Sequence, residues 1–283
     1  MPQKRSANRI NTLKTQAVDK LTGEGGSKVE LEQILERLAE QVEAVDAIIT
    51  PTQTKYIPSI GTSSEPTIVQ LLVSKWAEDY PEELPSVILK ERRLGEEGCF
   101  EIRYPENKRH YLDFGFSSST AHQDADNLSN LEWAIEFKKI NWCGDTGVDM
   151  SERAVGKLCS PYPSTGPILE DALRVSRHSF GKRHAVILLS PDIHPSQLEV
   201  CKDHPDRERR WKPEDENDRY KTLSGTFRKN NGYAFTSDPL LPFVEKIFEY
   251  KGIKYSEHIC RTVTGLTRHP VFSRLTLVGW EIQ

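Results

Sequence analysis

The 283-residue sequence has no apolar run that approaches the roughly 20 residues needed to cross a bilayer. Its first residues are basic but lack the apolar stretch and the small-residue cleavage site of a secretory signal. The five cysteines include no Cys-x-x-Cys pair, which argues against a disulfide framework and against a four-cysteine zinc site. We therefore expect a cytoplasmic protein with no membrane partner.

A strong excess of positive charge is also missing. The formal net charge is -4 and the isoelectric point about 6.1, so any surface that binds nucleic acid must be local. The composition is that of a polar globular protein, with 36% hydrophobic and 28% charged residues. This length suits one large domain, or one domain with a small appendage.

The chain divides into four segments by composition and hydrophobic periodicity. Residues 1–26 end in a Gly-rich stretch and indicate a flexible basic tail. Residues 27–62 contain an amphipathic helix with a capping box at its start, followed by a linker rich in Thr and Pro. Residues 63–190 form the predicted core. Residues 191–283 begin with a charged excursion and end with a helix and a pair of strands.

The core segment shows the order of elements on which the functional interpretation depends. A buried helix is predicted over 65–80, and a Gly- and Pro-rich loop over 144–167 precedes a helix over 168–178 and a buried strand over 183–190. Three further strands are predicted between the first helix and the loop, at 86–94, 99–116 and 131–140. Short connections make these three strands an antiparallel meander.

Charged residues interrupt two of these apolar strands. Alternation along residues 133–140 sends Glu136 and Lys138 to the same face, where an acid and a lysine need a partner or a metal ion. Asp113 interrupts aromatic and aliphatic neighbours in the preceding strand. Adjacent strands would bring the two carboxylates together as a hard-oxygen site for Mg²⁺, with Lys138 beside it.

This combination suits phosphodiester hydrolysis. Carboxylates hold the metal, the metal acidifies water and polarises the phosphate, and a lysine orients the water or neutralises charge. Glu-x-Lys begins at Glu106, Glu136 and Glu249, but only the middle one lies in an apolar strand downstream of another acid. The alternative is that Glu136 and Lys138 form an ordinary ion pair on a half-exposed sheet.

These residues resemble the PD-(D/E)XK nuclease superfamily. Its restriction-endonuclease-like α/β core consists of a helix, a three-strand meander, a crossover helix and a further strand. By its pattern Asp113 matches the first acid, Glu136 the second acid and Lys138 the lysine. Leu112 stands where a proline normally precedes the first acid. Glu65 looks like the extra acid that many members carry on the first helix, although the helix dipole alone would favour an acid there.

The resemblance implies Mg²⁺-dependent cleavage of DNA, with Mn²⁺ as a substitute metal and the backbone carbonyl of Phe137 as a further ligand. A type II restriction enzyme or a related bacterial defence nuclease is favoured, because the chain length accommodates one catalytic core with recognition elements. An RNA-directed nuclease stays open, as does a non-catalytic DNA-binding or assembly protein that keeps the fold. Cutting both strands of a duplex would call for a homodimer.

Other polar residues receive weaker interpretations. Arg and Asn side chains in 203–233 or 261–274 are candidates for base reading. Asp171, Arg174 and Arg177 on the predicted crossover helix are expected to be solvated. The Pro191-Asp192 dipeptide is rejected as the family motif because it follows the last predicted core strand.

Overall fold

The described part of the chain covers most of the predicted core and the C-terminal elements. A computed structural model describes residues 29–50, 58–81, 83, 86–89, 104, 110–117, 131–142, 151–160, 162, 166–178, 180–193, 237–269 and 272–283. The predicted tail over 1–26 and the candidate recognition segment over 203–233 lie outside these residues.

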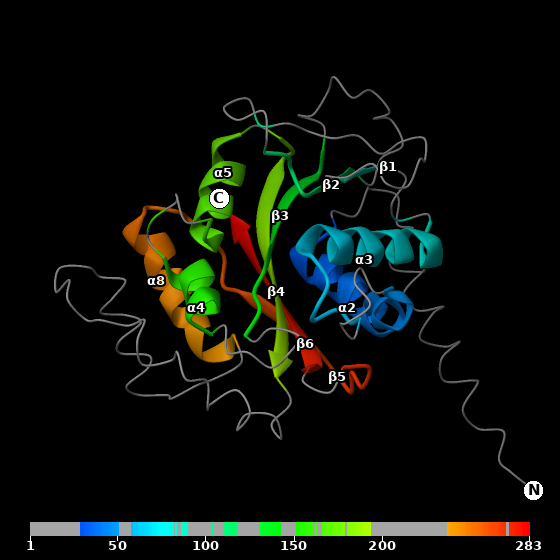
Figure 1. The fold of residues 1–283 in the computed structure, drawn as a ribbon. Coiled ribbons are helices and arrows are strands. Elements are labelled where there is room, and N and C mark those ends of the chain that lie inside the picture. The colour runs from blue at the N-terminus through cyan, green and yellow to red at the C-terminus, as the bar shows by residue number, and fades with distance from the viewer. Residues whose placement is uncertain are drawn as a thin grey trace, which may run out of the picture. The chain divides into compact units, whose positions relative to one another are not determined.

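A mixed six-stranded sheet organises the described residues (Figure 1). Its strands are β1 (Ser86–Leu89), β2 (Phe114–Ser117), β3 (Trp133–Lys139), β4 (Arg183–Ile193), β5 (Ile259–Thr264) and β6 (Phe272–Ile282). The spatial order is β1-β2-β3-β4-β6-β5. The first three strands form an antiparallel meander, β4 runs parallel to β3, and β6 is antiparallel to both of its neighbours.

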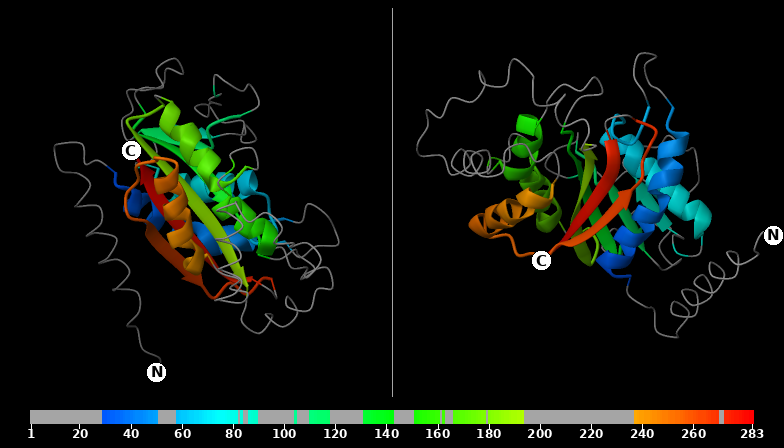
Figure 2. Two further views of the ribbon diagram at one scale, coloured as in Figure 1. Left: turned by 90° about the vertical axis from the view of Figure 1, so that its left-hand side faces the viewer. Right: turned by 90° about the horizontal axis from the view of Figure 1, so that it is seen from below.

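Helices cover both faces of this sheet (Figures 1 and 2). One face carries α2 (Leu31–Ile48) and α3 (Glu65–Asp79), and the other carries α4 (Ser151–Cys159), α5 (Ile168–Arg177) and α8 (Leu241–Tyr250). The apolar face of α2 packs against the sheet of the same molecule. Leu31 and Leu35 of this face lie so close to Gly279 of β6 that a methyl group on residue 279 would crowd both leucines. The chain is therefore a mixed α/β protein.

Ser64 caps the start of α3. The Ser64 hydroxyl accepts a hydrogen bond from the Thr67 N–H at 3.4 Å, and Pro66 occupies the first turn, where its missing N–H costs nothing. Ile68, Leu72 and other apolar residues of the helix are buried. This packing holds Glu65, the first residue of the helix, against the sheet.

Three elements differ from their predictions. Of the predicted strand over 99–116, only Phe114–Phe116 belong to β2, so Asp113 immediately precedes the strand, and residues 99–103 and 105–109 lie outside the described part of the chain. The predicted loop over 144–167 contains α4, whose Ala154 and Leu158 are buried in the core cluster with α5 and α8. The predicted strand over 183–190 continues as β4 to Ile193, because β6 pairs with it along this extension. Pro191 and Asp192 therefore lie inside the strand and not after it.

The C-terminal elements complete the same sheet. The predicted helix and strand pair are confirmed as α8, β5 and β6, and β6 pairs with β4 from Ile282 back to Phe272. Leu31–Gln283 forms one compact unit, so the predicted core and the C-terminal elements share one hydrophobic interior.

A buried polar network at the end of β4 ties that strand to β6. The Asp192 carboxylate accepts hydrogen bonds from the hydroxyls of Ser190 at 2.9 Å and Thr276 at 2.8 Å, and from Nε of Arg274 at 2.7 Å. Burial raises the pKa of Asp192 to about 6, although these three donors oppose the shift. The folded protein therefore holds a proton on Asp192 more tightly than the unfolded chain does.

This raised pKa predicts a pH-dependent stability. The contribution of Asp192 to the free energy of unfolding is fully present below the unfolded value of 3.8 and is lost as the pH rises through about 6. Urea unfolding should show wild type gaining roughly 1–2 kcal/mol between about pH 7.5 and about pH 5, relative to Asp192→Asn. Asp238→Asn removes an exposed acid that bonds the same Arg274 and should keep the wild-type pH dependence. Identical pH profiles for wild type and Asp192→Asn would contradict this interpretation.

Candidate functional site

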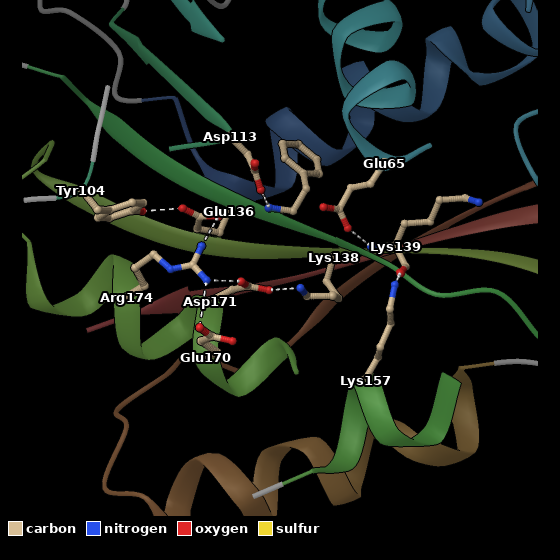
Figure 3. Close-up of polar contacts among 11 residues, drawn as sticks. Glu65, Tyr104, Asp113, Glu136, Lys138, Lys139, Lys157, Glu170, Asp171 and Arg174 are labelled. Atoms are coloured by element: carbon tan, nitrogen blue, oxygen red, sulfur yellow. Dashed lines mark hydrogen bonds and ion pairs between the residues drawn. The ribbon is translucent and has the colours of Figure 1, made fainter. Parts of the chain in front are cut away.

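Asp113 and Glu136 come together where β2 begins. Phe114 of β2 pairs with Ile135 of β3, so one further step of the same antiparallel register places Asp113 opposite Glu136. Both side chains are buried, with 5% and 1% of their surface exposed. Oδ2 of Asp113 accepts the backbone N–H of Phe137 at 2.9 Å. The two predicted carboxylates are therefore neighbours in an apolar interior (Figure 3).

Glu136 is held by two groups from other elements. The buried Tyr104 hydroxyl donates to Oε1, and Nη1 of Arg174 on α5 lies 3.4 Å from Oε2. Burial raises the pKa of Glu136 well above its ordinary value, and the charges of Asp113 and Asp171 raise it further, against the opposing charge of Arg174. This carboxylate would therefore gain from a further cation.

Lys138 and Glu136 point to the same face of β3 but pair with different partners. Nζ of Lys138 lies 2.7 Å from Oδ2 of Asp171, and Oδ1 of Asp171 lies 3.1 Å from Nη2 of Arg174. Arg174 also reaches Glu136, so the four side chains form a continuous chain of ion pairs (Figure 3). A simple ion pair between Glu136 and Lys138 is not what the structure contains.

The expectation that Asp171 and Arg174 are solvated is wrong. Asp171 is 3% exposed and the Arg174 side chain 16%, whereas Arg177 is exposed as expected. The sequence did carry a signal, because Asp171 follows Ile168 by three positions and precedes Val175 by four, which places it on the apolar face of α5. An acid on that face requires a cation from the sheet, and Lys138 supplies it.

Burial and ion pairing act in opposite directions on this pair. Burial raises the pKa of Asp171 to about 7, against the charges of Lys138 and Arg174. Burial by itself lowers the pKa of Lys138, yet the charges of Asp171 and Glu65 raise it above its ordinary value. The 2.7 Å contact and the second cation on Asp171 favour the ionised form.

Glu65 lies at the other face of β3, against the main chain. Its Oε2 accepts the backbone N–H of Lys139 at 2.5 Å, while Nζ of Lys157 on α4 donates to the carbonyl of Lys139 at 3.1 Å (Figure 3). The Lys139 side chain is buried and donates to the carbonyl of Gly61 at 2.8 Å. Burial, followed by the charge of Lys157, lowers the pKa of Lys139 to about 7 against the charge of Glu65. This arrangement holds the end of β3 immediately after Lys138.

The arginines of the second candidate recognition segment make contacts within the protein. Arg261 pairs with Glu32 of α2 at 2.5 Å. Arg268 donates to the main-chain carbonyl of Asp46 in the last turn of α2, and to that of Ile49, just after the helix, at 2.6 Å. Arg274 bonds the buried Asp192 at 2.7 Å. Each of these three side chains therefore has a partner within the protein.

Comparison with known proteins gives no further information on this site. Comparisons with protein-family models, with curated proteins and with solved structures found no match. Within the described ranges, no three His, Cys, Asp or Glu side chains group as ligands for a metal ion. The helices in the same ranges are too short or too polar to cross a bilayer.

Repulsion between the two buried carboxylates predicts that neutralising one of them stabilises the fold. In Asp113→Asn the amide oxygen can still accept the Phe137 N–H, and the amide nitrogen can donate to Glu136. We expect the metal-free variant to unfold at higher urea, with a gain of about 1–2 kcal/mol near pH 8. Asp79→Asn, which neutralises an acid that is 45% exposed, should change stability by less than about 0.5 kcal/mol. A less stable Asp113→Asn protein would argue against the repulsion.

Proposed function

We propose that the protein is a Mg²⁺-dependent endonuclease of the restriction-endonuclease-like fold that hydrolyses DNA phosphodiester bonds. The observation that carries this function is the buried pair of Asp113 and Glu136, with Lys138 two residues along the same face of β3. Adjacent carboxylates in an apolar interior repel each other, and a divalent cation between them would remove that cost. Such a pair is expected where metal binding has a function.

The order of elements supports the same proposal. The chain runs α3, β1, β2, β3, α5 and β4, with α4 inserted before α5, and β4 is parallel to β3. This order agrees with the helix, meander, crossover helix and strand that the resemblance implies. Asp113 lies immediately before the second strand of the meander, and Glu136 and Lys138 lie on the third, which supports the match to the superfamily pattern.

The residues present fit a magnesium or manganese ion. Asp113 and Glu136 would supply carboxylate oxygens, which are the hard ligands that Mg²⁺ prefers. Along a strand, the N–H and C=O of one residue point to the same neighbouring strand. The Phe137 N–H donates to Asp113, so the carbonyl of Phe137 faces the same region and is suited to be the third protein ligand. When bound, the ion would acidify water and polarise the phosphate.

The surrounding side chains have separate tasks in this proposal. Tyr104 fixes the orientation of Glu136 through its hydroxyl. Asp171 holds the Lys138 ammonium in its charged form on the face that carries Glu136, where it can donate to water or to a phosphate oxygen. Glu65 is a positioning residue here, since it accepts the main-chain N–H of Lys139 on β3, and its charge also favours the charged form of Lys138.

The more specific assignments rest on the resemblance. DNA is preferred to RNA as the substrate, and a type II restriction enzyme or related bacterial defence nuclease to other pathways, because the chain length fits one core with recognition elements. Cutting both strands of a duplex would require two copies of the chain. With Arg261, Arg268 and Arg274 engaged internally, base reading would fall to other side chains.

One observation favours a second candidate, a non-catalytic DNA-binding or assembly protein that keeps the fold. In the series of ion pairs that links Lys138, Asp171, Arg174 and Glu136, each buried charge has an opposite charge of the protein as its partner. A network of this kind could serve stability alone. Metal-dependent cleavage separates the two candidates.

Cleavage assays on supercoiled plasmid, labelled duplex DNA and labelled RNA test the proposed activity. Wild type should cut DNA with Mg²⁺ or Mn²⁺ and not with EDTA. Asp113→Asn, Glu136→Gln and Lys138→Ala should each lower the rate at least about 100-fold, because each removes a metal ligand or a donor to the reacting groups. Lys251→Ala is the matched control: it removes an exposed lysine from another Glu-x-Lys sequence and should cut like wild type.

Three outcomes of these assays decide between the candidates. Metal-dependent cleavage of DNA that survives in Lys251→Ala and fails in the three site variants supports the proposal. Cleavage of RNA alone replaces it with the RNA-directed alternative. A protein that cuts neither substrate with either metal is not a nuclease of this kind, and the non-catalytic candidate takes its place.

A further inference from the structure

The guanidinium of Arg174 divides its contacts between the sheet and its own helix. Nη1 faces Glu136 of β3 at 3.4 Å, whereas Nη2 faces Asp171 at 3.1 Å and Glu170 at 3.6 Å, both on α5 (Figure 3). Cζ of Arg174 also lies 5.5 Å from the centre of the Tyr104 ring. Arg174 can therefore give up the contact with Glu136 and keep its anchors on α5.

Arg174 is the cation that this structure supplies to Glu136. The carboxylate is 1% exposed and lies beside Asp113, so its negative charge needs compensation from a group within a few ångströms. Lys138, the other nearby cation on the same face, is turned to Asp171. A divalent ion bound by Glu136 and Asp113 would meet the guanidinium at short range, and like charges repel strongly where water is excluded.

We propose that Arg174 is an internal counter-ion of Glu136 that competes with the divalent cation and is displaced from this carboxylate when the cation binds. The inference rests on the proposed function, because it takes Asp113 and Glu136 as the metal ligands. Tyr104 is neutral and stays in place, since each carboxylate oxygen can accept more than one hydrogen bond. Arg174 is thus a positioning residue that acts through Glu136.

If Arg174 competes with the metal ion, replacing it raises the affinity for the ion, whereas replacing a purely structural arginine lowers that affinity. Loss of a structural residue loosens the site and weakens metal binding, as it does for most groups that orient ligands. Loss of a competing charge strengthens binding. Arg174→Gln should therefore bind Mn²⁺ at least about fivefold more tightly than wild type, and Arg174→Lys, which keeps the charge, should stay within about twofold.

Isothermal titration of the full-length protein with Mn²⁺, without nucleic acid and near pH 8, measures this affinity apart from any cleavage. Arg177→Gln is the matched control, because Arg177 lies one turn further along α5, is exposed and carries the same charge. It should bind Mn²⁺ like wild type. Asp113→Asn should lose binding, which identifies the site that is being titrated.

A second measurement does not need Arg174→Gln and decides the question if that variant does not fold. The Nε–Hε NMR resonance of Arg174, identified as the one absent from Arg174→Lys, should shift when Mg²⁺ is added, while that of Arg177 should not. A static Arg174 resonance at saturating Mg²⁺ would overturn the competition.

The outcomes separate this inference from the proposed function. Binding that depends on Asp113 and tightens in Arg174→Gln supports both. Binding that depends on Asp113 but is equal or weaker in Arg174→Gln overturns the role of Arg174 and leaves the metal site intact. Absence of any Asp113-dependent binding overturns the metal site and this inference together.

Discussion

The carboxylates of Asp113 and Glu136 lie side by side in an apolar interior, and most of the polar contacts around β3 compensate their charge. Glu136 and Asp113 repel each other, and burial removes the water that would screen them. The neighbouring helix α5 turns Arg174 inward to compensate Glu136, and Asp171 then joins Arg174 to Lys138. The acids of the sheet and the charges of the helix therefore depend on each other.

Buried acids alone do not mark a site, as the other end of the sheet shows. Asp192 is as deeply buried as Glu136 and has a raised pKa, but it is surrounded by donors from Ser190, Thr276 and Arg274. Its hydrogen bonds join two strands, and its partners in the described residues are two hydroxyls and a guanidinium. Glu136 differs because its neighbour across the strands is another acid, which favours a cation and not a further donor.

The end of β3 is held from both faces of the sheet. Glu65 at the start of α3 binds the Lys139 N–H, and Lys157 of α4 binds the Lys139 carbonyl. The backbone of Lys139, next to Lys138, is thus fixed by helices from both layers. Rigid placement of this kind is what a site needs if its charged groups are to act without first reorganising.

Local patterns in the sequence determined much of this protein, because strand alternation and helical periodicity depend only on neighbouring residues. They placed Glu136 and Lys138 on one face, α3 from Glu65, and the C-terminal strand pair. Tertiary structure alone decided that Lys138 pairs with Asp171, that Glu65 binds the backbone of β3, and that β4 extends to Ile193. Those outcomes depend on contacts between distant segments, where burial makes an unpaired charge or an unpaired strand edge costly.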